Sequence, residues 1–215
     1  MIKVVVIFGK WVKGTCCWIL KNSSLFIMKH YKIFLRQISL LIAVLGITIL
    51  ILSFRNGSPQ RNIEVAKITD TNEVRVDTDK FSIALPKGWR HFVQESQGFK
   101  IFFLMSPPVD NFAPNLNILT EDTQGMSPDE YMKVSDENMK KGGMIKDGSG
   151  DFEVNGVIGK YSTSVLSYQG TNIALKSYVF IKNGLAYVIT GSCLVTQKDS
   201  YRPIFDKTVK TFKIK

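Results

Sequence analysis

The chain contains one run of eighteen residues without a charge, and this run constrains every interpretation of the rest. Residues Gln37 to Phe54 read QISLLIAVLGITILILSF, and most of them are Leu, Ile or Val. A helix rises about 1.5 Å per residue, so the run would extend roughly 27 Å, about the thickness of a hydrocarbon core. The pattern therefore predicts a transmembrane helix.

The residues that follow the run favour an uncleaved signal anchor. A signal peptide usually has a shorter apolar region, of about 7–15 residues, and ends in a small-x-small cleavage site. Here the run is followed by RNGSP, which is a poor site, and no Cys stands there for acylation. A cleaved signal peptide is the first alternative. A buried helix of a soluble protein is the second, and the basic flanks of the run argue against it.

Charge is distributed unevenly along the chain. Residues 1–62 hold nine of the 28 Lys and Arg side chains and no Asp or Glu, whereas residues 63–215 hold 19 basic and 18 acidic side chains. The high net charge therefore belongs to the N-terminal segment, which argues against nucleic-acid binding by the folded part. The positive-inside rule places the N-terminus in the cytoplasm and residues 63–215 outside. We expect a single-pass protein of the cell membrane.

These observations divide the chain into four parts. Residues 1–36 form a basic cytoplasmic leader, 37–54 the transmembrane anchor, 55–79 a tether with a weak strand near its end, and 80–215 a folded domain. Within the leader, residues 1–27 are either a translation-start artefact, since Met28 begins a short basic segment before the apolar run, or a short interfacial segment. No function is assigned to them.

Apolar alternation between turn residues predicts six strands in the domain. The strands are expected at residues 81–85, 99–105, 115–121, 157–168, 173–182 and 185–194. The last three are joined by short turns, one of them containing Asn183-Gly184, so they should form an antiparallel meander.

Two helices are expected beside these strands. Ser127, Pro128 and Glu130 form a capping-box sequence at the start of a helix that ends before Gly142. A second amphipathic helix over residues 199–212 should pack on the sheet through Tyr201, Ile204, Phe205, Val209 and Phe212, with Pro203 in its first turn. Helices that are separate from the strands indicate an α+β domain, an antiparallel β-sheet covered by helices.

The residues that open the domain carry a family resemblance. Phe81-Ser82-Ile83-Ala84-Leu85-Pro86-Lys87-Gly88-Trp89 resembles the F-x-I-x-x-P-x-x-W pattern of the PsbP-like fold, shared by the PsbP protein of photosystem II and the bacterial DcrB-type proteins. The order of helix, meander and closing helix is also similar over residues 80–215. The resemblance implies a PsbP-like sandwich in an exported, usually membrane-tethered accessory domain without established catalysis. Some members bind metal ions, and no defined ligand set matches this sequence.

Two segments are candidates for binding a partner. The loop from Ser106 to Pro114 is stiffened by prolines, and loops on a rigid scaffold are common binding sites. Trp89 follows a Pro-Lys-Gly turn and could line the edge of a pocket, although core or rim packing is the simpler role for it. In the same way, Phe112 in the loop could be tucked into the core. The candidate partner-binding residues are Trp89, Pro107, Pro108, Asp110, Asn111 and Phe112.

Residues suited to catalysis or metal binding do not form a recognisable motif. His91 is the single histidine of the domain, and Cys193 lies in an apolar run and is expected to be a buried small side chain. Gly148-Ser149-Gly150 is expected to be a flexible loop and not a phosphate cradle. Glu121 and Asp122 would need Asp110 beside them to hold a cation. We therefore predict no enzyme, no catalytic residue, no cofactor and no metal site.

Two functions fit this sequence. The first is a non-catalytic accessory protein that is anchored by residues 37–54 and assists the assembly or stability of a membrane or envelope complex by binding a protein of that complex. The alternative is a small-ligand or metal-binding module of the cell envelope, because a curved sheet under helices can hold a pocket.

Overall fold

The computed structural model describes residues 67–68, 74–96 and 98–215. The predicted leader, anchor and most of the tether lie outside the described residues. In the part that is described, no helix combines the length and the apolar character needed to cross a membrane.

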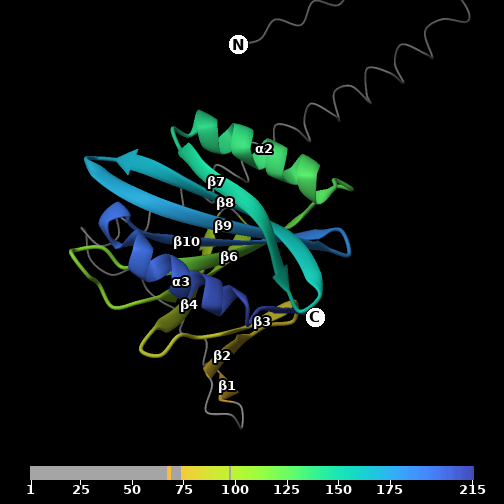
Figure 1. Ribbon diagram of the computed structural model, residues 1–215. Coiled ribbons are helices and arrows are strands. Elements are labelled where there is room, and N and C mark those ends of the chain that lie inside the picture. Colours follow the sequence, from red (N-terminus) through yellow and green to blue (C-terminus); the bar gives the residue numbers. More distant parts are fainter. Residues whose placement is uncertain (1–66, 69–73, 97) are drawn as a thin grey trace, which may run out of the picture. The chain divides into compact units, whose positions relative to one another are not determined.

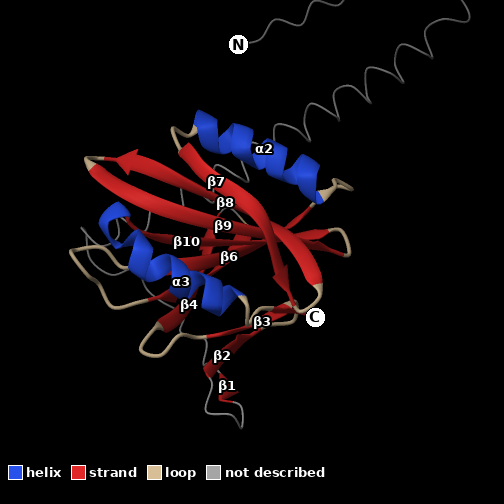
Figure 2. Cartoon of the chain, in the orientation of Figure 1, coloured by secondary structure: helices blue, strands red, loops and turns tan. Residues whose placement is uncertain are grey.

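Two antiparallel sheets make up most of the domain (Figures 1 and 2). The large sheet has the strand order β4-β5-β6-β10-β9-β8-β7, and the small sheet has the order β1-β2-β3-β11. The strands of the large sheet are β4 (Arg90–Ser96), β5 (Phe99–Met105), β6 (Asn115–Asp122), β7 (Ile145–Val154), β8 (Val157–Tyr168), β9 (Thr171–Lys182) and β10 (Leu185–Leu194). Those of the small sheet are β1 (Lys67–Ile68), β2 (Val74–Asp77), β3 (Phe81–Ala84) and β11 (Lys213–Ile214).

The helices cover opposite faces of the large sheet. Helix α2 (Pro128–Lys141) packs on β7, β8 and β9, while α3 (Lys198–Val209) follows the short 3-10 turn η1 (Val195–Gln197) and packs on β10 and β3. Successive side chains of a strand point to opposite faces. Accordingly, Tyr178 of β9 belongs to the cluster that contains Phe205 of α3, whereas Val179 belongs to the cluster that contains Tyr131 of α2. The fold is therefore α+β, as predicted.

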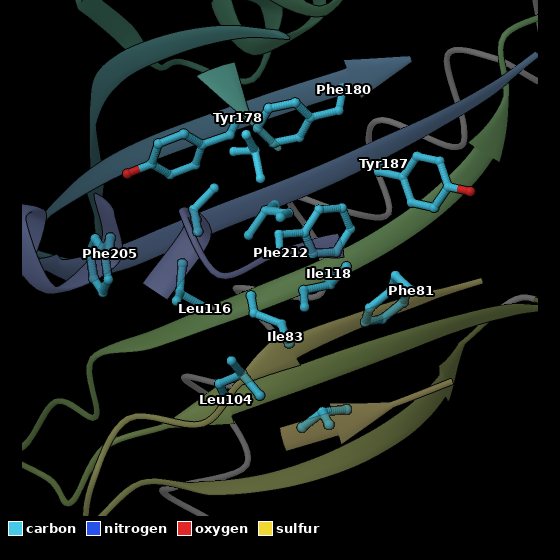
Figure 3. Close-up of a cluster of buried hydrophobic side chains, with 14 of the residues drawn as sticks. Phe81, Ile83, Leu104, Leu116, Ile118, Tyr178, Phe180, Tyr187, Phe205 and Phe212 are labelled. Atoms are coloured by element: carbon cyan, nitrogen blue, oxygen red, sulfur yellow. The ribbon is translucent and has the colours of Figure 1, made fainter. Parts of the chain in front are cut away.

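The main core lies between the large sheet, α3 and the small sheet (Figure 3). Aromatic side chains from distant parts of the chain meet there. Phe81 of β3 lies 5.3 Å from Phe212, and Phe180 of β9 lies 6.0 Å from it, measured between ring centroids. Burial of large aromatic side chains dominates the energy of a core of this size. The C-terminal segment therefore joins the two sheets.

Most predicted elements are present. The six expected strands correspond to β3, β5, β6, β8, β9 and β10. Ser127 is the N-cap of α2, its hydroxyl accepts a hydrogen bond from the Glu130 N–H, and the Glu130 carboxylate accepts one from the Ser127 N–H at 2.9 Å. The capping box is thus confirmed. The weak strand expected near the end of the tether is β2, which pairs with β3, so the folded domain begins before Lys80.

Three local expectations are wrong. The sequence predicts no strand between residues 85 and 99, whereas residues 90–96 form strand β4, which pairs along its length with β5. Gly148-Ser149-Gly150 belongs to strand β7, which pairs with β8 and has a register shift between Lys146 and Gly148. Helix α3 ends at Val209, so Phe212 reaches the core from the segment after the helix, and Pro203 lies inside the helix and not in its first turn.

Candidate binding groove

Trp89 is held in place by a tight turn between β3 and β4. The Trp89 N–H donates a hydrogen bond to the Pro86 carbonyl at 3.0 Å, and Gly88 has φ +80°. A positive φ at the third residue of a four-residue turn favours Gly, because this backbone conformation is strained for most residues that have a side chain. The Pro-Lys-Gly sequence therefore fixes where Trp89 leaves the sheet.

The indole of Trp89 packs against helix α3. Its ring meets the Phe205 ring edge to face, with 6.4 Å between centroids and 82° between planes. Trp89 remains half-buried, whereas Phe205 is fully buried. One side of the indole is thus fixed in the core and another faces solvent. This is the combination found in aromatic anchors of binding sites.

A groove of about 740 Å³ lies between this turn and the outer flank of α3. Ile204, Lys207, Thr208 and Thr211 follow the spacing i, i+3, i+4, i+7, which places them along one side of the helix and its extension. The remaining residues come from β2, β3 and the turn. The groove is lined by Val74, Ala84, Leu85, Pro86, Lys87, Gly88, Trp89, Ile204, Lys207, Thr208 and Thr211.

The chemistry of the groove is an apolar floor with cationic rims. Lys87 on the turn and Lys207 on the helix are both exposed. The two hydroxyls are used within the fold, because Thr208 donates to the Ile204 carbonyl at 2.8 Å and Thr211 accepts from the Ala84 N–H at 2.9 Å. The described residues that line the groove include no carboxylate.

Asp206, the acidic residue of α3 next to Lys207, points to the flank of the helix opposite to the groove. Asp206 Oδ1 lies 2.7 Å from Lys176 Nζ and accepts a hydrogen bond from the Tyr178 hydroxyl at 2.5 Å. Burial raises the pKa of Tyr178 far above its ordinary value, and the hydrogen bond to Asp206 adds to the shift. Arg202 lies on the same flank and contacts Asp147 at 3.4 Å. Helix α3 is therefore neutralised on one side and cationic on the other.

The loop from Ser106 to Pro114 lies at the same end of the β4–β5 pair as Trp89, but it is separate from the groove. Arg90 pairs with Met105, so the loop begins beside Trp89. At its tip, Asp110 and Asn111 have positive φ values and form a two-residue turn closed by Val109 and Phe112. The loop residues do not line the groove among the residues that the structure describes.

Two contacts show how this loop is held. Gln197 Nε2 donates to the Val109 carbonyl at 3.3 Å and to Asp110 Oδ2 at 3.2 Å, which joins the tip to η1. Phe112 is half-buried and packs with Met139 of α2 and Leu166 of β8, on the sheet face opposite to Trp89. Pro107 and Pro108 are exposed. The candidate residues therefore divide between two surfaces, and their role in binding stays a prediction.

The remaining candidates for chemistry are dispersed. Cys193 is completely buried, and burial raises its pKa to about 11, as expected for a structural thiol. Glu121 accepts a hydrogen bond from the Tyr131 hydroxyl, and Asp122 accepts one from the Gln124 N–H at 2.6 Å. Both acids lie at the far end of β6 from Asp110. In the described part of the chain, no group of three or more His, Cys, Asp or Glu side chains could hold a metal ion.

Sequence reasoning missed the helix wall of the groove. Ile204 was expected to pack on the sheet, but its side chain is 37% exposed and lines the groove. The signal was present in the sequence: Ile204, Thr208 and Thr211 repeat at helical spacing beside the core stripe of Phe205 and Val209. Without knowledge of the partner segment, that stripe cannot be distinguished from an ordinary solvent-facing side.

Comparison with known proteins gives structural neighbours only. No protein-family model matches the chain, and a search of curated proteins gives no match. Among solved structures, the chain is similar to cyanobacterial PsbP (CyanoP) from Synechocystis sp. PCC 6803, with a TM-score of 0.49 and 13% identity over 75% of this chain and 99% of that chain. It is also similar to LpqN of Mycobacterium tuberculosis, described as involved in cell envelope biogenesis, with a TM-score of 0.48 and 15% identity over 75% and 94%.

A third neighbour is protein PA94 of Pseudomonas aeruginosa, whose function is unknown, with a TM-score of 0.47 and 16% identity over 60% of this chain and 88% of that chain. A PsbP protein is thus among the structures that this chain resembles.

Proposed function

We propose that this chain is a non-catalytic accessory protein of the cell envelope that binds another protein of a membrane or envelope complex. Residues 37–54 anchor it in the cytoplasmic membrane, and the domain lies outside. Binding occurs in the groove between Trp89 and α3. LpqN, described as involved in envelope biogenesis, is compatible with such a role, but the proposal rests on the groove.

The observation that carries the proposal is the partly exposed indole of Trp89. A Trp side chain that is fixed on one edge and open on another loses little conformational freedom when a partner covers it, and Trp is enriched among residues that dominate binding energy. Here the indole is fixed by the Pro86 turn and by Phe205. The apolar lining beside it supplies area that water leaves on binding.

Site-specific photo-crosslinking in native membranes tests this function. A benzophenone side chain is introduced at Ile204, which lines the groove and is 37% exposed, and in a control at Ile158, which is 68% exposed and does not line it. We expect one stoichiometric partner to be crosslinked from position 204 and not from 158. Equal crosslinking from both positions, or none from either, would contradict the proposal.

A further inference from the structure

We infer that the groove recognises an acidic segment of the partner protein in which an apolar side chain is flanked by carboxylates. This inference rests on the proposed function and specifies the chemistry of its partner. The apolar side chain would lie against Trp89 and Leu85, and the carboxylates would lie near Lys87 and Lys207.

The two lysines provide the charge complementarity. Lys87 lies on the turn and Lys207 on the helix, so they belong to opposite walls of the groove, and both are exposed. Among the described residues neither lysine forms an ion pair with a carboxylate. Complementary charge on a partner would steer its approach and suppress binding of basic segments.

Arg75 adds positive charge near the C-terminal end of α3. A helix C-terminus carries partial negative charge on its free carbonyls, which would repel an anion. Arg75 Nη2 donates a hydrogen bond to the Thr211 carbonyl at 2.7 Å, just past the last helical residue, and so places a cation against that end. Lys207 lies in the last turn as well. These cations offset the negative helix end next to the groove.

Within the described part of the chain, Asp206 of α3 and Asp77 of β2 are engaged by other partners and do not compete for these lysines. Asp206 is held by Lys176 and Tyr178 on the opposite flank of α3. Asp77, at the end of the same strand β2 that supplies Val74 to the groove, lies 2.7 Å from Lys215. The apolar lining lies between the two lysine rims. Its half-buried or exposed residues are Val74, Leu85, Pro86, Trp89 and Ile204. A segment with the pattern acid–apolar–acid matches this order.

The test measures binding of labelled peptides to the full chain in nanodiscs by fluorescence anisotropy. One peptide has a Leu-Phe-Leu centre flanked on both sides by Asp-Asp, and the matched peptide has Lys-Lys flanks. We expect the acidic peptide to bind at least about tenfold more tightly and to weaken as salt rises, because exposed charges are screened. Equal binding of both peptides would overturn the inference, and so would displacement of the acidic peptide by oleate at equal concentration.

Two double variants locate the interaction. Lys87→Gln with Lys207→Gln removes both rim charges, whereas Lys133→Gln with Lys182→Gln removes two exposed lysines of α2 and β9 that do not line the groove. We expect the first pair to weaken acidic-peptide binding by about fivefold to tenfold and the second to change it less than twofold. Equal effects of the two pairs would contradict the inference. Unchanged melting temperatures would exclude misfolding, since all four side chains are exposed.

The crosslinking and peptide experiments separate the two proposals. A partner that is crosslinked at position 204 but binds the Lys87→Gln/Lys207→Gln variant normally would leave the accessory function standing and overturn the acidic-segment inference. The reverse result is acidic-peptide binding that depends on both lysines in a chain that crosslinks to no protein. That result would support the chemistry of the groove and contradict the accessory function.

Discussion

The ring of Phe205 lies directly over Gly191, so close that a Cβ atom on residue 191 would be 2.5 Å from Phe205 Cδ2. This contact lets α3 approach β10 and thereby sets the position of the groove wall. We expect Gly191→Ala to destabilise the domain by about 1–3 kcal/mol, the usual cost of overpacking a core. Urea unfolding of the full chain in mild detergent, followed by near-ultraviolet circular dichroism, measures it.

A matched glycine substitution controls for a general effect of added side chains. At Gly142, which has negative φ, a Cβ would be 3.4 Å from the nearest atom, the Met139 carbonyl oxygen. Gly142→Ala should therefore change stability by less than about 0.5 kcal/mol. If Gly191→Ala were equally silent, the close packing of Phe205 on β10 would be refuted.

Loss of one partner of the Lys176–Asp206 ion pair should strongly destabilise the folded domain, because the pair is mostly shielded from water. The Lys176 side chain is 12% exposed, and its ammonium also lies 4.7 Å from the Tyr161 ring centroid. Asp206→Asn leaves this ammonium without its anion, which should cost about 3 kcal/mol of unfolding free energy. Tyr178→Phe removes one hydrogen bond and should cost about 1 kcal/mol.

The control for this pair is an exposed ion pair of the same type. Glu95 and Lys100 are 3.7 Å apart, and their side chains are 71% and 65% exposed. Glu95→Gln should therefore cost less than about 0.5 kcal/mol, because such pairs are screened by solvent. Equal losses for Asp206→Asn and Glu95→Gln would show that burial does not strengthen the Lys176–Asp206 pair.

Elements with a strong local signal were predictable from the sequence. The capping box of Ser127 and Glu130 and the Asn183-Gly184 turn specify α2 and the β9–β10 hairpin almost without tertiary contacts. Strand β7 was missed because Gly148 and Gly150 are typical of loops. In the structure, a Cβ atom on residue 150 would be 2.9 Å from Cε1 of Tyr161 on β8. Pairing of β7 with β8 therefore favours glycine at position 150.

The groove is only half predictable, for a similar reason. Trp89 follows a turn that the Pro-Lys-Gly sequence predicts, and the sequence therefore indicated Trp89 as a candidate binding residue. The opposite wall comes from Ile204 and Lys207, more than a hundred residues later in the chain, and no local pattern pairs the two. The loop with Phe112 was predictable as a stiff connection. That Phe112 packs on the other face of the sheet from Trp89 depends on the tertiary structure.

The capping box should make part of the stability depend on pH. The hydrogen bonds from the Ser127 backbone N–H and hydroxyl hold the pKa of Glu130 below its ordinary value of 4.5. Because the pKa of Glu130 is lower in the folded state than in the unfolded state, ionised Glu130 stabilises the fold above pH 4.5. This stabilisation is lost as the pH falls through the pKa of Glu130 in the folded state. The stability difference between wild type and Glu130→Gln should therefore shrink on acidification.

Urea unfolding between pH 3 and 7 measures this difference. Glu137→Gln is the control, because Glu137 lies on the same helix outside the capping box and is exposed. Its difference from wild type should vary less with pH than that of Glu130→Gln. A capping contribution that stays constant over this range would contradict the titration of Glu130 in the folded state.

Cys193 should be chemically silent in the folded domain. Burial raises its pKa from 9.0 to about 11, so the reactive thiolate is scarce and the sulfur is covered. Since the folded value is raised, the associated stability is complete below pH 9 and is lost as the pH rises through about 11. In a Cys16→Ser/Cys17→Ser variant, a thiol reagent at pH 8 should react rapidly only after denaturation. Rapid labelling of the native variant would contradict this burial.

Gly88 should control the position of Trp89 and therefore binding in the groove. Its φ of +80° is strained for residues with side chains, and Asn tolerates this region better than Val does. Among the described residues, and apart from its two chain neighbours, no atom lies within 4 Å of a Cβ at this position, so only the backbone conformation is at issue. We expect Gly88→Val to weaken acidic-peptide binding by about tenfold or more, because the turn that carries both Lys87 and Trp89 would change shape.

Gly88→Asn is the matched variant and should retain binding within about threefold. Trp11→Phe and Trp18→Phe leave Trp89 as the single tryptophan, so its emission reports the turn directly. In that background, Gly88→Val should shift the emission to longer wavelength, as the indole leaves Phe205 and becomes more hydrated, whereas Gly88→Asn should not. Weaker binding without an emission shift would mean that the groove recognises its ligand independently of Trp89.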